Sequence, residues 1–279
     1  MRIQKLLVPV DFSAATEKAI AYAVVLAKKW QSKLVFVHGY QVAFATYERP
    51  PMAPTVNPMV GTGLSEKELS REKLNDFLEA FPQLDEIEHE DVVGLGFAVD
   101  VIRRTAEAEN VDVIVMGTSG ASELEGFFIG TNTEKVSRKA PCPVLVIPDD
   151  LKSYEINTVC LALDILNDDN TINLDVLVTL LTSFGAKLRI IHISDKEETG
   201  FKKEELPAHF KESLNQIQHS IHVFYAGDPQ EGIEEFLDKF PIDLIALLHR
   251  EHGFFERLFR PGIRKKMIFK TKVPLLILK

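Results

Sequence analysis

The chain has 279 residues, of which 46% are hydrophobic and 26% charged, so it has enough apolar material for one large or two ordinary globular domains. Its formal net charge of −9 argues against a general nucleic-acid binder, because such proteins carry a basic surface that neutralises phosphates. The two cysteines, Cys142 and Cys160, do not provide a disulfide framework, and the apolar run from Leu6 to Val10 is too short for a signal peptide or a membrane span. We therefore expect a cytoplasmic protein that has neither nucleic acid nor membrane as a partner.

The first half begins with a short apolar run, 5–10, that ends at Asp11. Ser13 is a candidate N-cap for the helix that follows, because alanine and leucine recur there at helical spacing. A second run, 33–38, leads to Gly39. The proline-rich stretch 42–63 has no clear periodicity and predicts a long loop.

Two more apolar runs, 111–116 and 143–147, complete this half. Their successive apolar residues are typical of strands covered on both faces, as in a parallel sheet whose strands are joined by helices. In such a doubly wound sheet, ligands bind at the carboxyl ends of the strands where the winding direction reverses. Asp11 and Gly117 are therefore expected near a binding site.

The second half repeats this order. Its apolar runs match the four runs of the first half and are 158–164, 187–192, 242–247 and 274–278. Four matches in one order indicate a duplication, with one domain over residues 1–149 and a second over 150–279. His38 and His192 hold equivalent positions in the two halves, which favours a structural role for both.

Three glycines follow the run 111–116. Gly117, Gly120 and Gly130 precede Thr131 and a helical segment. Glycine lets the backbone approach a phosphate without a Cβ in between, and the unpaired amides at a helix start attract anions. Ordinary turn glycines are the alternative, and the lysine of a P-loop is missing. The order of strand, glycine loop and helix favours a phosphate site.

This pattern of Gly, two residues, Gly, nine residues, Gly and Thr resembles that of the nucleotide-binding members of the universal stress protein family. The opening Val-Pro-Val-Asp-Phe-Ser and the later Ala-Pro-Cys-Pro-Val-Leu-Val fit the same family. The resemblance implies an α/β fold of two tandem doubly wound domains, each a Rossmann-like, five-stranded parallel sheet of strand order 3-2-1-4-5 flanked by helices. Because family members commonly pair through their last strands, it also implies an intramolecular pseudo-dimer of the two halves, with a homodimer as a further option.

The resemblance further implies a ligand, ATP or another adenine nucleotide, with Mg²⁺ as an option through the phosphates. Pro9, Val10 and Asp11 would border the adenine and ribose, with Gly39 at the end of the second strand and Met116 beside the base. The residues implied around the ribose and phosphates are Gly117, Gly120, Gly130, Thr131 and Asn132. Asp11 has an alternative role as a helix cap, since a carboxylate beside phosphates is repulsive unless a ribose hydroxyl or a metal intervenes.

The second half departs from the glycine pattern. We place His249 and His252 at the positions of Gly117 and Gly120, and Ile263 follows the remaining glycine. Because bulky side chains occupy the space that phosphates need, we expect that this half does not bind ATP in the same way. A metal held by the two histidines is an alternative, for which no third ligand is evident.

Three functions agree with these features. The first is a nucleotide-dependent regulator of the stress response, in which ATP favours one arrangement of the two domains. The second is a slow ATPase or phosphotransferase, although no catalytic base or P-loop lysine stands beside the glycine loop, so no catalytic or metal-binding side chain is assigned. The third is a nucleotide-free interaction module, in which the basic stretch 257–270 docks an acidic partner. The alternative for this stretch is a solvated helix face. The intact glycine pattern favours the first.

Overall fold

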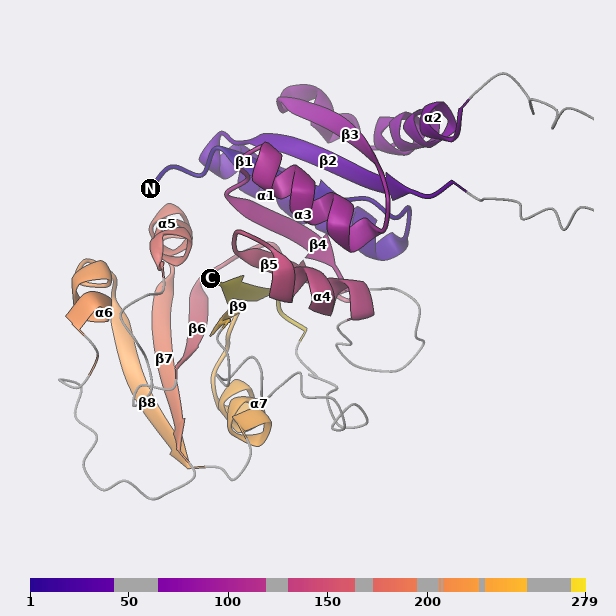
Figure 1. The fold of residues 1–279 in the computed structure, drawn as a ribbon. Coiled ribbons are helices and arrows are strands. Elements are labelled where there is room, and N and C mark those ends of the chain that lie inside the picture. Colours follow the sequence, from indigo (N-terminus) through magenta and orange to yellow (C-terminus); the bar gives the residue numbers. More distant parts are fainter. Residues whose placement is uncertain are drawn as a thin grey trace, which may run out of the picture.

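The computed structural model describes residues 1–42, 65–118, 130–163, 173–194, 206, 208–225, 229–249 and 272–279. The described strands form one sheet of ten strands, with helices on both faces (Figure 1). Several features singled out in the sequence lie outside the described residues, namely Gly120, His252, Ile263, the basic stretch 257–270 and nearly all of the proline-rich stretch.

Helices alternate with strands along the chain, as predicted. The first half contains β1 (Lys5–Pro9), α1 (Ala14–Trp30), β2 (Lys33–Tyr40), α2 (Glu66–Glu79), the 3₁₀ helix η1 (Pro82–Glu86), β3 (His89–Leu95), α3 (Ala98–Ala108), β4 (Val113–Gly117), α4 (Thr131–Lys139) and β5 (Val144–Ile147). The second half contains β6 (Thr158–Leu163), α5 (Asp175–Phe184), β7 (Lys187–Ser194), α6 (Ala208–Ser213), β8 (His219–Tyr225), α7 (Pro229–Lys239), β9 (Leu244–Leu248) and β10 (Leu275–Leu278).

The strand order of the sheet is β3-β2-β1-β4-β5-β10-β9-β6-β7-β8. Each half therefore has the predicted order 3-2-1-4-5, and neighbouring strands within each half are parallel. The halves meet through an antiparallel pairing of β5 with β10, their last strands, which merges them into one continuous sheet. Because this joint is antiparallel, the carboxyl ends of the two sets of parallel strands lie at opposite edges of the sheet.

Some contacts recur at equivalent places in the two halves. The Asp112 carboxylate accepts hydrogen bonds from two backbone amides at the start of β1, and the Asp243 carboxylate accepts two at the start of β6. Nδ1 of His38 lies 2.8 Å from a carbonyl oxygen after the end of β1, and Nδ1 of His192 lies 3.3 Å from one at the end of β6. The two histidines thus make the same structural contact. The domain boundary between residues 149 and 150 stays a prediction.

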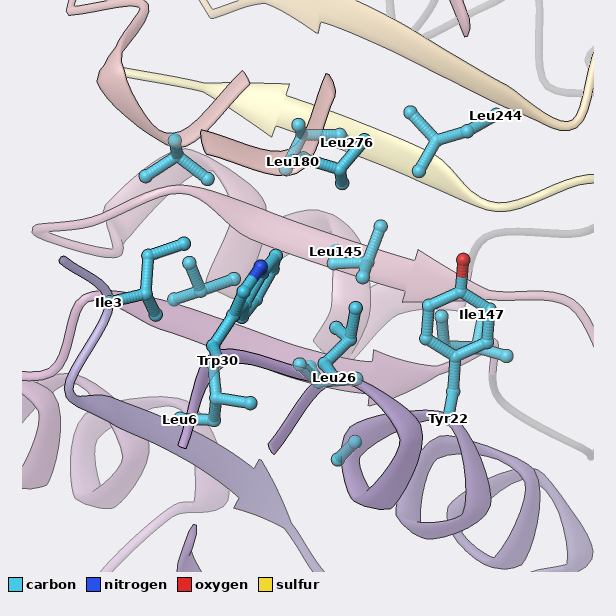
Figure 2. Close-up of a cluster of buried hydrophobic side chains, with 14 of the residues drawn as sticks. Ile3, Leu6, Tyr22, Leu26, Trp30, Leu145, Ile147, Leu180, Leu244 and Leu276 are labelled. Carbon is cyan, nitrogen blue, oxygen red and sulfur yellow. The ribbon is translucent and has the colours of Figure 1, made fainter. Parts of the chain in front are cut away.

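A hydrophobic core crosses the joint between the halves. Helices α1, α2, α5 and α6 cover one face of the sheet, and α3, α4 and α7 cover the other. On the first face, Leu26 and Trp30 of α1 lie in one cluster with Leu145 of β5 and Leu276 of β10 (Figure 2). Nε1 of Trp30 also donates a hydrogen bond of 3.0 Å to the Ser183 hydroxyl of α5. The first half is therefore held against the second by packing as well as by strand pairing.

Helix α1 begins where the sequence predicts. The Ser13 hydroxyl accepts a hydrogen bond of 3.3 Å from the Thr16 amide, so Ser13 is the N-cap. Ala15, Ala19 and Ala23 are buried, and their small side chains let the helix lie close to the sheet. This close packing places the start of α1 over the carboxyl ends of β1 and β4.

Candidate functional site

A cavity lies at the carboxyl ends of β1, β2 and β4, where the winding direction of the first half reverses. Seven of the ten residues predicted for the site line this cavity: Pro9, Val10, Asp11, Gly39, Met116, Gly117 and Asn132. Gly130 and Thr131 come just before Asn132 at the start of α4, whereas Gly120 lies outside the described residues. The fold thus brings predicted residues from four separate stretches of chain to one place.

The Asp11 carboxylate organises the turn between β1 and α1. Its Oδ1 accepts hydrogen bonds from the Ser13 amide at 3.0 Å, the Ser13 hydroxyl at 2.5 Å and the Thr16 hydroxyl at 2.7 Å. Burial raises the pKa of Asp11, but these hydrogen bonds together lower it by more, so the pKa lies below its ordinary value. Ser13 is the cap of α1, and Asp11 supports it by accepting hydrogen bonds from the Ser13 amide and hydroxyl. Among the described residues these bonds engage Oδ1, which leaves Oδ2 available to a ligand.

Phe12, the next residue, has a φ of +65°, a left-handed conformation that is costly for a bulky side chain. Its ring packs against the rings of His38 and Phe77, at centroid distances of 4.6 and 5.4 Å. The Nζ of Lys73 lies 4.1 Å from the centre of the same ring. These contacts hold the strained turn that carries Asp11 at the edge of the cavity. Phe12 does not stand out in the sequence, because nothing in the local pattern marks a left-handed phenylalanine.

Gly117 lacks a side chain for a packing reason. A Cβ placed there would lie 2.4 Å from the Ala15 carbonyl oxygen and 2.8 Å from the Ala15 Cβ. The space beside Gly117 is thus filled by α1, which corrects the argument that this glycine bares the backbone for a phosphate. A Cβ placed on Gly39 would lie 3.2 Å from the Ala98 Cα. The missing side chain of Gly39 therefore leaves room for the start of α3.

The amino end of α4 faces the cavity. Gly130 is its N-cap and no side chain there accepts a hydrogen bond from the first turn, so the amides of the first turn have no partner within the helix. Thr131 and Asn132 are exposed, and Asn132 lines the cavity. The buried Thr133 hydroxyl donates a hydrogen bond of 3.1 Å to the Gly117 carbonyl. Thr133 therefore ties α4 to β4, and this bond uses the one proton that its hydroxyl can donate.

Two polar residues at this edge were missed in the sequence. Thr118 lines the cavity, and its hydroxyl donates a hydrogen bond of 2.9 Å to Oδ1 of Asp149. The pKa of Asp149 lies above its ordinary value, chiefly because the carboxyl group is partly buried. The Asp150 and Asp11 carboxylates also raise this pKa, whereas the hydrogen bond from Thr118 lowers it. A second carboxylate therefore lies near Asp11. The apolar lining residues Val37, Ala98 and Ile102 were also missed, because in the sequence they look like ordinary core residues.

The register of the sheet corrects the alignment of the second half. Gly117 pairs with Ile147, the last residue of β5, and Leu248 pairs with Leu278, the last residue of β10. Leu248 is therefore the counterpart of Gly117, and placing His249 there was wrong by one residue. Leu248 is buried, so a side chain does occupy the position in the second half where the first half has none.

The described residues contain no group of three or more His, Cys, Asp and Glu side chains that could hold a metal ion. Both cysteines are buried. Burial raises the pKa of the Cys142 thiol to about 12, and it raises the pKa of Cys160 above its ordinary value.

The first half is thus a doubly wound α/β unit with a cavity at its switch point. The model of the Universal stress protein family matches residues 2–148, more than half of the sequence, and the chain belongs to this family. A putative universal stress protein of Staphylococcus aureus is 31% identical over 146 residues, which are 52% of this chain and 83% of that protein. A universal stress protein of Methanocaldococcus jannaschii is 26% identical over 154 residues, which are 52% of this chain and 94% of that protein.

Similarity to solved structures extends over the whole chain. A universal stress protein from Archaeoglobus fulgidus superposes with a TM-score of 0.70 at 19% sequence identity, covering 100% of this chain and 99% of that one. At this identity the likeness shows the fold, and it extends over both halves. In the part of the chain that the structure describes, no helix is long and apolar enough to cross a membrane.

Proposed function

We propose that the protein binds ATP or another adenine nucleotide in the cavity of its first half and acts as a nucleotide-dependent regulator in the stress response. The observation that carries the proposal is the convergence of apolar walls, one carboxylate and the start of α4 on a single cavity at the switch point. These are the chemical groups that an adenine base, a ribose and phosphates need.

The apolar walls suit the base. Val10 and Met116 are buried and line the cavity from β1 and β4, while Ala98 and Ile102 line it from α3. Ligand sites are mostly apolar with a few placed polar groups, and a flat aromatic base gains from burial between such side chains. The proposal therefore assigns the base to the space between β1, β4 and α3.

The polar groups suit the sugar and the phosphates. Oδ2 of Asp11 is available to accept a hydrogen bond from a ribose hydroxyl. The uncapped amides at the start of α4 would bind phosphate, with support from the helix dipole. If Mg²⁺ accompanies the phosphates, it would reduce their repulsion from the Asp11 and Asp149 carboxylates.

The test is nucleotide affinity of the native chain and of Asp11→Asn, measured by calorimetry with ATP, AMP and a cyclic nucleotide, with and without Mg²⁺. The Asn variant keeps an oxygen for Ser13 and Thr16, but it replaces the oxygen that would accept from the ribose with an amide NH2 group, which only donates. We expect it to lose about tenfold in affinity, which corresponds to about 1.4 kcal/mol.

Asp238→Asn is the matched control, because it removes one exposed carboxylate from α7 in the second half, and it should bind like the native chain. Release of ADP from bound ATP would identify the slow-ATPase alternative. Absence of any nucleotide binding by the native chain would leave the interaction module as the remaining function and would refute the proposal.

A further inference from the structure

We propose that Lys279, at the end of the last strand of the second half, is a positioning residue for the candidate site in the first half. It holds the carboxyl end of α4 and thereby fixes the amides that the amino end of α4 presents to the cavity. This inference rests on the proposed function and assigns the second half a role in it.

The contacts of Lys279 are specific to the last turn of α4. Its Nζ donates hydrogen bonds to the carbonyl oxygens of Ser137 at 2.5 Å and Arg138 at 3.2 Å. The last four carbonyls of a helix have no partner within it, and a cation there is favoured by the helix dipole. Helix α4 has nine residues, a length at which an isolated helix is marginal in water. It therefore depends on contacts of this kind for its position.

The antiparallel joint explains how the second half reaches this helix. Ile277 of β10 pairs with Val144 of β5, so the end of β10 runs toward the start of β5, which directly follows α4. Lys279 accordingly lies near Cys142 and Arg138. Figure 1 shows the end of the chain beside β5 and α4. A parallel joint would have carried the end of β10 to the opposite edge of the sheet.

The residue after the last strand differs between the two halves. By the register of the sheet, Pro148 holds the place after β5 that Lys279 holds after β10. Proline has no ammonium group, so Pro148 cannot donate the hydrogen bonds that Lys279 donates.

Helix α4 can pass this constraint to the cavity because it is short and tied at both ends. Nine residues span about 13 Å at 1.5 Å per residue. At the amino end the Thr133 hydroxyl is bonded to the Gly117 carbonyl, and in the middle Val136 is buried. A shift at the carboxyl end therefore moves or loosens the amides near Asn132.

The charge of Lys279 gives a second test, which is the pH dependence of nucleotide affinity. Burial lowers the pKa of Lys279 to about 8, with Arg138 lowering it and Cys142 raising it. The titratable and charged groups that act on the ammonium are Arg138 of α4 and the Cys142 thiol, and Asp112 acts in turn on that thiol. An anionic nucleotide at the other end of α4 favours the charged amine. Affinity should therefore fall as pH rises from 7.5 to 9.5.

The experiment compares nucleotide affinity in the native chain, Lys279→Met and Lys279→Arg. We expect the Met variant to lose about five- to tenfold in affinity, a typical size for coupling between sites, and the Arg variant to recover most of it. The decline with pH should be present in the native chain and absent in Lys279→Arg, whose side chain stays charged. Lys239→Met is the matched control, since that exposed lysine pairs with Glu235 on α7, and it should bind and titrate like the native chain.

Native-like affinity of Lys279→Met, or identical pH profiles for the native chain and Lys279→Arg, would overturn the inference. If Lys279→Met does not fold, as judged by circular dichroism, the Arg variant and the two pH profiles decide the question. If the native chain binds no adenine nucleotide, the proposed function fails by itself. Hydrogen exchange then tests the anchor, because loss of Lys279 should speed exchange in α4 and not in α3, and unchanged exchange in α4 would refute it.

Discussion

Single residues at the carboxyl ends of β1 and β4 serve the fold and the cavity at once. Asp11 supports the Ser13 cap and the Thr16 hydroxyl at the start of α1 with one carboxylate oxygen and leaves the other available to a ligand. Gly117 lines the cavity, yet its missing side chain is required by Ala15. At such positions a substitution that removes binding can act through stability, so both must be measured.

We expect Gly117→Ala to destabilise the protein by about 1–3 kcal/mol, because the new Cβ would overlap the backbone of Ala15, which cannot rotate away. Urea unfolding followed by circular dichroism measures this loss. Gly39→Ala is the graded comparison, since its Cβ would meet Ala98 at 3.2 Å and not at 2.4 Å, and its loss should be smaller. Equal losses for the two variants would contradict the packing explanation.

Among the elements, the turn between β1 and α1 is the one under strain. Phe12 adopts its left-handed conformation because its ring packs against His38 of β2 and Phe77 of α2. The strain is thus balanced by aromatic packing, and the turn directs Asp11 to the cavity. Helix α4 is the second element on which the site depends, and its position is set from both ends.

At position 12 we therefore expect a glycine variant to be more stable than an alanine variant. Phe12→Gly and Phe12→Ala both lose the ring contacts, but glycine adopts a positive φ without the cost that alanine incurs. We expect the Gly variant to be the more stable by about 1 kcal/mol in urea unfolding. At the exposed helical position Glu17 the order should reverse, because alanine is the better helix former. The same order at both positions would show that the turn is not strained.

At the scale of the whole molecule, the two halves share one sheet and one core cluster. The β5–β10 joint pairs Leu276 with Leu145, and helices α1 and α5 pack over the same face (Figure 2). Because buried apolar area is continuous across the joint, we expect the halves to unfold together and not as independent domains.

Leu276→Ala tests this cooperativity, since Leu276 is fully buried in the second half. We expect a loss of about 2–5 kcal/mol, the usual cost of such a cavity. Trp30, the only tryptophan of the sequence, lies in the first half and reports its unfolding by fluorescence. Its transition and the circular dichroism transition should move together to lower urea concentration. Leu69→Ala, at an exposed site on α2, should leave both in place, and a Trp30 transition unmoved by Leu276→Ala would disprove shared unfolding.

Much of the architecture could be predicted from local sequence. Apolar runs marked eight of the ten described strands, all except β3 and β8, and helical spacing after Ser13 marked α1 and its cap, because periodicity is a property of neighbouring residues. The glycine pattern and its family resemblance led to the strand order and to seven of the sixteen residues that line the cavity. These are features that a short stretch of chain specifies by itself.

Other features depended on the tertiary structure. The strained Phe12, the contact of Gly117 with Ala15 and the counterpart role of Leu248 follow from how distant segments meet. The reach of Lys279 to α4 follows from the antiparallel direction of the β5–β10 joint. The sequence alone determined where most strands and the helix α1 form. Only the tertiary structure decided which residue faces which, because register and strand direction are set by packing between segments far apart in the chain.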